Sequence, residues 1–136
     1  MKKYNVAILG ATGAVGQEMM KILAERDFPI NKLSLLASSR SVGRTYDFKG
    51  QTIAVTEACD SAFDGVDIVL GAAENDISRH FAPAIKASGA VYIDNSSAFR
   101  LDPDVPLVVP EINPGDAKLH RGIIANQHKR MILSVV

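Results

Sequence analysis

The sequence has a single cysteine, Cys59, and no tryptophan. One cysteine cannot form an internal disulfide, so the chain fits a reducing cytoplasm. It also has no excess charge, because 15 basic residues balance 15 acidic ones. This balance gives no basic footprint for nucleic acid or for an anionic membrane. No apolar run approaches the roughly 20 residues of a membrane span. We therefore expect a cytoplasmic protein with neither nucleic acid nor membrane as a partner.

Other special features are equally sparse. The apolar run after Lys3 is shorter than the core of a secretion signal, so we expect no targeting segment. His80, His120 and His128 show no metal-ligand spacing with one another or with Cys59, which predicts that no metal is bound. Carboxylates flank Cys59 in the sequence and disfavour its reactive thiolate form, so we expect this side chain to be inert.

Hydrophobic residues make up 47% of the 136 residues, enough for one compact domain with a core. Continuous apolar runs predict strands at 6–9, 33–37, 52–56, 66–70, 91–93, 107–109 and 123–125. Apolar residues at three- and four-residue spacing predict helices at 14–26 and 76–87, with a kink or a broken start caused by Pro83. The polar stretches 40–50 and 94–106 are predicted loops. This alternation predicts an α/β fold: a doubly wound, mostly parallel Rossmann-type sheet with helices on both faces.

A glycine turn follows the first predicted strand directly. The segment 10–16 has the pattern G-x-x-G-x-x-G and leads into the first predicted helix. Gly10 permits the tight turn, Gly13 lets the backbone approach a pyrophosphate, and Gly16 lets the helix pack close to the strand. The bare amides and positive dipole end of that helix would then face the anion. A turn without a ligand is the alternative, but the strand-turn-helix context favours a dinucleotide.

The end of the second predicted strand indicates which dinucleotide. An acidic residue at this place usually holds the ribose 2′-hydroxyl of NAD. This chain instead has Ser38, Ser39 and Arg40, and Arg44 follows shortly after. A guanidinium can pair with a 2′-phosphate, so we predict NADP. The alternative is a solvated loop with a surface arginine.

Four separated motifs occur in a specific order: 6–16 (VAILGATGAVG), 37–41 (ASSRS), 94–100 (DNSSAFR) and 108–113 (VVPEIN). Together they resemble the aspartate-semialdehyde dehydrogenases. The resemblance implies NADPH-dependent reduction of aspartyl phosphate to aspartate semialdehyde, on the route to lysine, threonine and methionine. It also implies a homodimer.

The resemblance assigns particular residues to the cofactor and the substrate. Cofactor-binding positions are Gly10, Thr12, Gly13, Ala14, Val15 and Gly16 in the turn, with Ser39 and Arg40 at the 2′-phosphate and Asn95 on the nicotinamide side. Arg100 matches the family's arginine for the substrate phosphate or inorganic phosphate. Its polar loop suits an anion, although an ion pair with Asp102 or Asp104 is the alternative.

The resemblance is lost after Asn126. Family members continue into Pro-Asn-Cys, where the cysteine is the nucleophile, whereas Lys129 stands at that place here. An amine cannot form the thioester that accepts hydride. We therefore expect an NADP-binding domain at 1–126 and a divergent tail at 127–136. We expect no catalytic residue and no second, catalytic and dimerisation domain, as in a truncated or frameshifted gene.

Three hypotheses follow. The chain is a catalytically incompetent cofactor-binding remnant, a half-enzyme completed by a separate chain, or a regulatory module that binds NADP or phosphate without reaction. A downstream reading frame that starts near Pro-Asn-Cys would favour the second. Tight NADPH binding by a stable isolated chain without turnover would favour the third.

Overall fold

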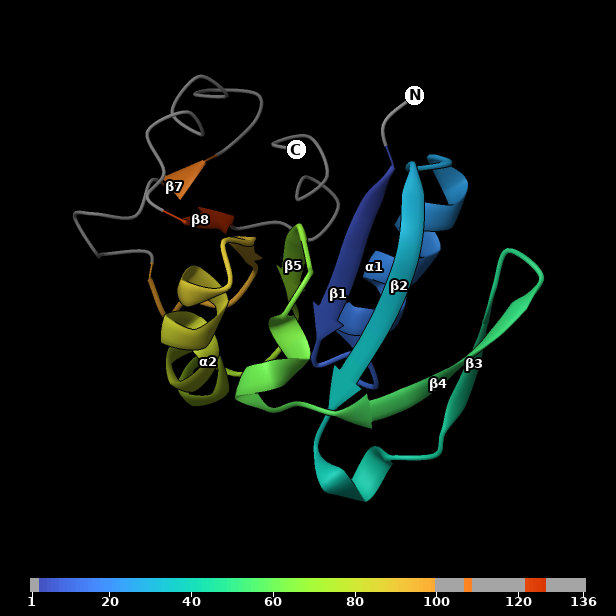
Figure 1. Cartoon of the computed structure of the whole chain (residues 1–136), viewed down its shortest axis with the longest axis horizontal. Helices are drawn as coiled ribbons and strands as arrows, with labels where there is room; N and C mark the ends of the chain where they lie inside the picture. The colour runs from blue at the N-terminus through green and yellow to red at the C-terminus, as the bar shows by residue number, and fades with distance from the viewer. Residues whose placement is uncertain (1–2, 100–106, 109–121, 127–136) are drawn as a thin grey trace.

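A computed structural model describes residues 3–99, 107–108 and 122–126 of the chain. Within these residues eight strands form one sheet in the order β3-β4-β2-β1-β5-β6-β8-β7 (Figure 1). The strands are β1 (Tyr4–Leu9), β2 (Ile30–Ala37), β3 (Thr45–Phe48), β4 (Gln51–Glu57), β5 (Ile68–Gly71), β6 (Val91–Asp94), β7 (Leu107–Val108) and β8 (Ile123–Asn126). The α-helices are α1 (Ala14–Glu25) and α2 (Asn75–Ala87), and two short 3-10 helices are η1 (Ser39–Ser41) and η2 (Asp60–Phe63).

The winding of the chain changes direction at β1. This strand pairs in parallel with β2 on one side and with β5 on the other, so Leu9 lies level with both Leu36 and Gly71. All other pairings are parallel except that of β3 with β4. The predicted doubly wound, mostly parallel α/β fold is confirmed. In such sheets the ligand crevice lies outside the carboxyl ends of the strands at this switch point.

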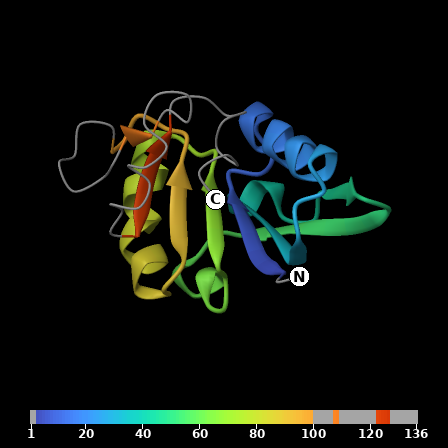
Figure 2. The ribbon, with the colours of Figure 1, turned by 90° about the horizontal axis from the view of Figure 1, so that it is seen from above.

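Each face of the sheet carries its own apolar core because side chains alternate along a strand. Val6 and Ile8 of β1 face α1, and Ala7 and Leu9 face the opposite cluster, to which α2 contributes. The helices therefore cover opposite faces, as predicted. Figure 2 shows β1, β5, β6 and β8 side by side in the order that the pairing gives. All four of these β1 side chains are at most 1% exposed, which explains the unbroken apolar run in the sequence.

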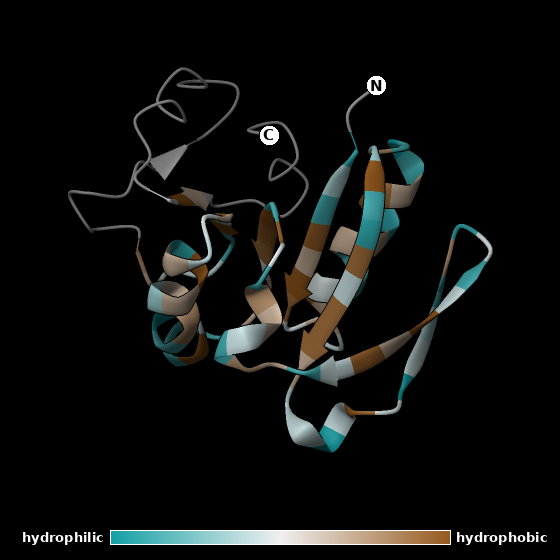
Figure 3. Ribbon diagram, in the orientation of Figure 1, coloured by the Kyte–Doolittle hydropathy of each residue, from teal (hydrophilic) through white to brown (hydrophobic). Residues whose placement is uncertain are grey.

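One predicted loop contains a strand. We predicted that 40–50 has no regular structure, but Thr45–Phe48 forms β3 and pairs antiparallel with β4. Lys49 and Gly50, both with positive φ, make the tight turn between them. The prediction was wrong because β3, the outer strand of this edge hairpin, is polar and mostly exposed, so it has no apolar run to reveal it. Figure 3 shows teal and pale residues toward its tip, whereas brown residues gather at the carboxyl ends of β1 and β2.

The remaining predicted elements are present with small changes at their ends. The strand β2 begins three residues earlier than predicted, at Ile30. The helix α2 continues from Asn75 to Ala87 with Pro83 inside it, so the broken start that we considered does not occur. Predictions that concern residue 109, Arg100 and the tail 127–136 fall outside the described residues. Among the described helices, none is long and apolar enough to cross a membrane.

Candidate functional site

The glycine turn joins β1 to α1 at the carboxyl edge of the sheet. Gly10 has φ +86°, and its amide and that of Ala11 donate to the carbonyl of Leu36 at 2.9 and 3.1 Å. These bonds tie the turn to the end of β2. The helix begins after Gly13, which has no side chain to cap it, and its first turn contains no acidic residue. Its first amides therefore remain available for an anion.

The three motif glycines differ in the space around them. A Cβ on Gly16 would lie 2.4 Å from the Gly10 carbonyl oxygen, so only glycine lets α1 approach the turn this closely. On Gly10 it would lie 2.8 Å from the Ala73 amide nitrogen, where the turn meets the loop after β5. On Gly13 the nearest atom, Gly10 O, is 3.7 Å away. The open side of Gly13 thus fits the close backbone approach that a pyrophosphate needs.

The segment after β2 lies beside this turn. Ser38, Ser39 and Arg40 are exposed just beyond Ala37, and Ser39 opens the short helix η1. The pairing of β2 with β1 brings this segment to the same edge of the sheet as the glycine turn. No carboxylate lies in it to repel a phosphate. The role of Arg40 in binding the cofactor stays a prediction.

The loop after β5 contacts the glycine turn, and the sequence alone did not lead us to expect this. Ala72 donates its amide to the Leu9 carbonyl at 2.8 Å, and Gly10 packs against the backbone of Ala72 and Ala73. Ala72 and Ala73 have short side chains and are half-buried beside the turn. The run Gly71-Ala72-Ala73 directly after a buried strand was the available signal.

The loop after β6 carries Asn95 and is fixed by a buried carboxylate. Asp94 is 0% exposed. Its Oδ1 accepts the amide of Ser96 at 2.9 Å, and its Oδ2 accepts the hydroxyls of Ser96 at 2.6 Å and Ser78 at 2.8 Å. The amide of Asn95 donates to the Gly71 carbonyl at 3.0 Å. The structure therefore places Asn95 beside the end of β5.

Tyr92 completes this buried group. Its hydroxyl lies 2.7 Å from Ser78 Oγ. Because the single Ser78 proton goes to Asp94, the Tyr92 hydroxyl must be the donor in this contact. Burial, and then the charge of Asp94, raise the pKa of Tyr92 above its ordinary value. Tyr92 therefore keeps its proton at neutral pH.

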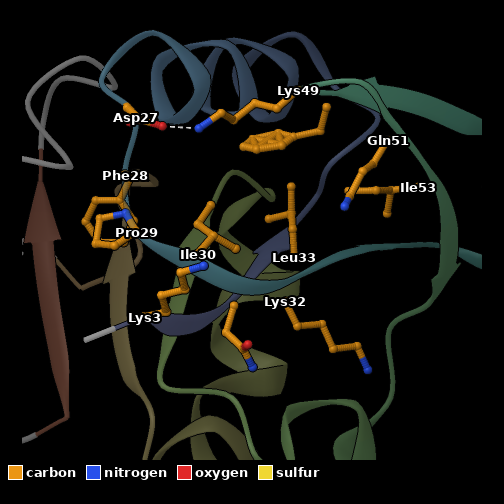
Figure 4. A pocket seen from close by; sticks show the side chains of 12 residues that line it. Lys3, Asp27, Phe28, Pro29, Ile30, Lys32, Leu33, Lys49, Gln51 and Ile53 are labelled. Carbon is orange, nitrogen blue, oxygen red and sulfur yellow. Dashed lines mark hydrogen bonds and ion pairs between the residues drawn. The ribbon is translucent and has the colours of Figure 1, made fainter. Parts of the chain in front are cut away.

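Other candidate features lie apart from this edge. A groove of about 640 Å³ lies between the amino-terminal half of β2 and the β3–β4 hairpin, at the opposite end of β2 from Arg40. Figure 4 shows the ion pair between Asp27 and Lys49 at one side of it. Cys59 is exposed, with its Sγ 3.4 Å from Ser61 Oγ. Within the described part of the chain, no three acidic, histidine or cysteine side chains form a group that could hold a metal.

The switch point, the glycine turn and the uncapped helix start define a dinucleotide-binding domain of the doubly wound class. The comparisons with known proteins make this specific. The family model for the NAD-binding domain of semialdehyde dehydrogenase matches residues 5–120, and the chain belongs to this family. It binds a nicotinamide dinucleotide.

Individual relatives agree. An aspartate-semialdehyde dehydrogenase from Synechocystis sp. is 54% identical over 128 residues, which is 94% of this chain. The crystal structure of aspartate-semialdehyde dehydrogenase II from Vibrio cholerae has a TM-score of 0.90 and 46% identity, over 98% of this chain and 44% of that one. The Candida albicans enzyme, solved with NADP, has a TM-score of 0.71 and 27% identity, over 90% and 42% of the two chains. The chain spans 38% of the length of the Synechocystis relative.

Proposed function

We propose that this chain is the NADP-binding part of an aspartate-semialdehyde dehydrogenase. The whole protein would reduce aspartyl phosphate to aspartate semialdehyde with NADPH, in the cytoplasm and as a homodimer. The observation that carries the choice of NADP is the end of β2, where Ser38, Ser39 and Arg40 replace the carboxylate that NAD-binding folds use. The Candida albicans relative was solved with NADP, and this supports NADP as the cofactor of this chain.

The residues of the site divide the work of holding the cofactor. The first amides of α1 would bind the pyrophosphate, and Arg40 with Ser39 would bind the 2′-phosphate. Asn95 would contact the nicotinamide half, whose chemistry is the donation of hydride to an acyl group. Arg100, which lies outside the described residues, would bind the substrate phosphate. No carboxylate in the first turn of α1 opposes the anion.

The NADP assignment predicts a large effect of Arg40→Ala. We expect this substitution to weaken NADPH binding by about 10- to 100-fold, because a charge-assisted pair with a phosphate is lost, and to leave NADH binding nearly unchanged. Titration calorimetry with both nucleotides measures the ratio of the two affinities. Lys32→Ala is the matched control, since it removes an exposed charge at the other end of β2. Equal affinities for NADPH and NADH in the unsubstituted chain would rule out the assignment.

A further inference from the structure

The carboxylate of Asp94 is fully buried, and burying a charged group costs free energy. A buried charge is costly unless hydrogen bonds compensate it, and two apolar side chains could join β6 to α2 at lower cost. Asp94 is compensated by three donors, of which two belong to Ser96 in the following loop. Ser78 lies in the first turn of α2, whose positive dipole end also favours the charge. The carboxylate thus binds the loop itself and does not merely join two elements.

The rest of the loop is held as tightly. Ser96 Oγ accepts the amide of Ala98 at 3.2 Å. Asn75, the first residue of α2, accepts the amide of Ser97 at 3.0 Å and donates to Ser97 Oγ at 2.6 Å. Arg79 donates to the Ala98 carbonyl, and its guanidinium lies 5.5 Å from the centre of the Phe99 ring. The first two turns of α2 therefore hold residues 97–99 of this loop, whereas Gly71 and Asp94 hold the amides of Asn95 and Ser96.

Gly71, the last residue of β5, lies so close to Tyr92 and Asp94 that it leaves no room for a side chain. A Cβ on Gly71 would lie 2.6 Å from the Tyr92 ring and hydroxyl and 2.8 Å from Asp94 Oδ1. Its carbonyl meanwhile accepts the amide of Asn95. Three elements, β5, β6 and α2, thus converge on one short loop at the carboxyl edge of the sheet.

The position of the loop indicates what it serves. A doubly wound sheet binds the two halves of a dinucleotide on the two sides of its switch point. The adenosine half belongs to the β1–α1–β2 side, where Arg40 lies, so the nicotinamide half belongs to the β5–α2–β6 side. We propose that Asp94, Ser78 and Ser96 are positioning residues, which fix Asn95 where it contacts the nicotinamide half. This inference rests on the proposed function.

The test uses two ligands that contact different parts of the cofactor site. Adenosine 2′,5′-bisphosphate reaches only the adenosine side, whereas NADPH reaches both. In Ser96→Ala we expect NADPH affinity to fall about 3- to 10-fold, because both hydrogen bonds of Ser96 Oγ are lost. The affinity for adenosine 2′,5′-bisphosphate should stay within about twofold, since that site is remote. Ser96→Thr keeps the hydroxyl and should restore NADPH binding.

Ser88→Ala is a closely matched control. Ser88 Oγ also accepts the amide two residues later, that of Ala90, and donates to the Ile85 carbonyl, but at the far end of α2. It should lower the melting temperature, though less than Ser96→Ala because no buried charge loses a donor, and leave both affinities unchanged. Melting curves of each variant report whether the chain is folded in the titrations.

The outcomes are distinct. An equal fall in both affinities for Ser96→Ala, or no fall in either, would overturn the positioning role and leave the proposed function intact. An unsubstituted chain that binds neither probe would contradict the proposed function, and this inference with it. A selective loss of NADPH affinity that Ser96→Thr reverses supports the inference.

Discussion

At the scale of single residues, Gly13 and Gly16 give opposite predictions for the same substitution. In Gly13→Ala the new methyl has no atom nearer than 3.7 Å, and the φ of −77° suits alanine, so stability should change by less than about 1 kcal/mol. The methyl would, however, stand where the pyrophosphate approaches. We expect NADPH affinity to fall at least about tenfold, measured by calorimetry, with the melting curve nearly unchanged.

Gly16→Ala is the counterpart. Its methyl would lie 2.4 Å from the Gly10 oxygen and 2.7 Å from Ala11 Cα, both backbone atoms that cannot move aside easily. We expect a loss of about 1–3 kcal/mol in the free energy of unfolding, measured by urea denaturation.

A Gly13→Ala protein that binds NADPH as well as the unsubstituted chain would show that no pyrophosphate lies against this turn.

Some residues of the candidate site could be predicted from the sequence and others could not. The glycine turn, Arg40 and Asn95 could be selected because each directly follows a recognisable strand. Ser78 could not, because it lies 16 residues before Asp94, and only the packing of α2 on β6 brings the two together. A polar residue inside a helix pattern gives no sign of such a partner.

At the scale of elements, Pro83 in α2 gives a stability prediction. Proline lacks the amide that would donate to the Arg79 carbonyl, and in a helix interior it costs about 3 kcal/mol relative to alanine. Proline also restricts the conformations of the unfolded chain, and this stabilises the folded state by up to about 1 kcal/mol. Pro83→Ala should therefore raise the free energy of unfolding by about 2 kcal/mol in urea denaturation.

Pro83→Gly serves as the control for that change. It restores the amide but has the lower helix propensity of glycine, so its gain should be about 1 kcal/mol smaller. If Pro83→Ala proved less stable than the unsubstituted chain, α2 would have to depend on the ring of Pro83 for packing.

Elements also differ in how far the sequence predicts them. β1 and β5 are buried on both faces and appear as continuous apolar runs. The amino-terminal half of β2 was missed because Asn31 and Lys32 are exposed there, and β4 pairs only with residues 35–37 of that strand. The strand β4 was predicted at 52–56, but its hairpin partner β3 was missed because Lys49-Gly50 is not one of the usual turn pairs. The start of β2 and the strand β3 were missed because their side chains are exposed, not because their backbone is irregular.

At the scale of the whole molecule, one edge of the sheet gathers all the predicted cofactor residues within the described part of the chain. The turn after β1 and the segments after β2, β5 and β6 come from different regions of the sequence, and the parallel pairing brings their starts to that edge. The groove beside Lys49 lies at the other end of β2. We therefore expect the nucleotide to bind at the carboxyl edge of the sheet only.

A titration of the isotopically labelled chain with NADPH, followed by amide chemical shifts, tests this central claim most directly. We predict the largest shifts at residues 11–16, 39–41, 72–73 and 95–97, and small shifts at 27–33, which line the groove. The largest changes at 27–33 and 48–53, or no change at saturating NADPH, would contradict the claim that the dinucleotide binds across the carboxyl ends of β1 and β5.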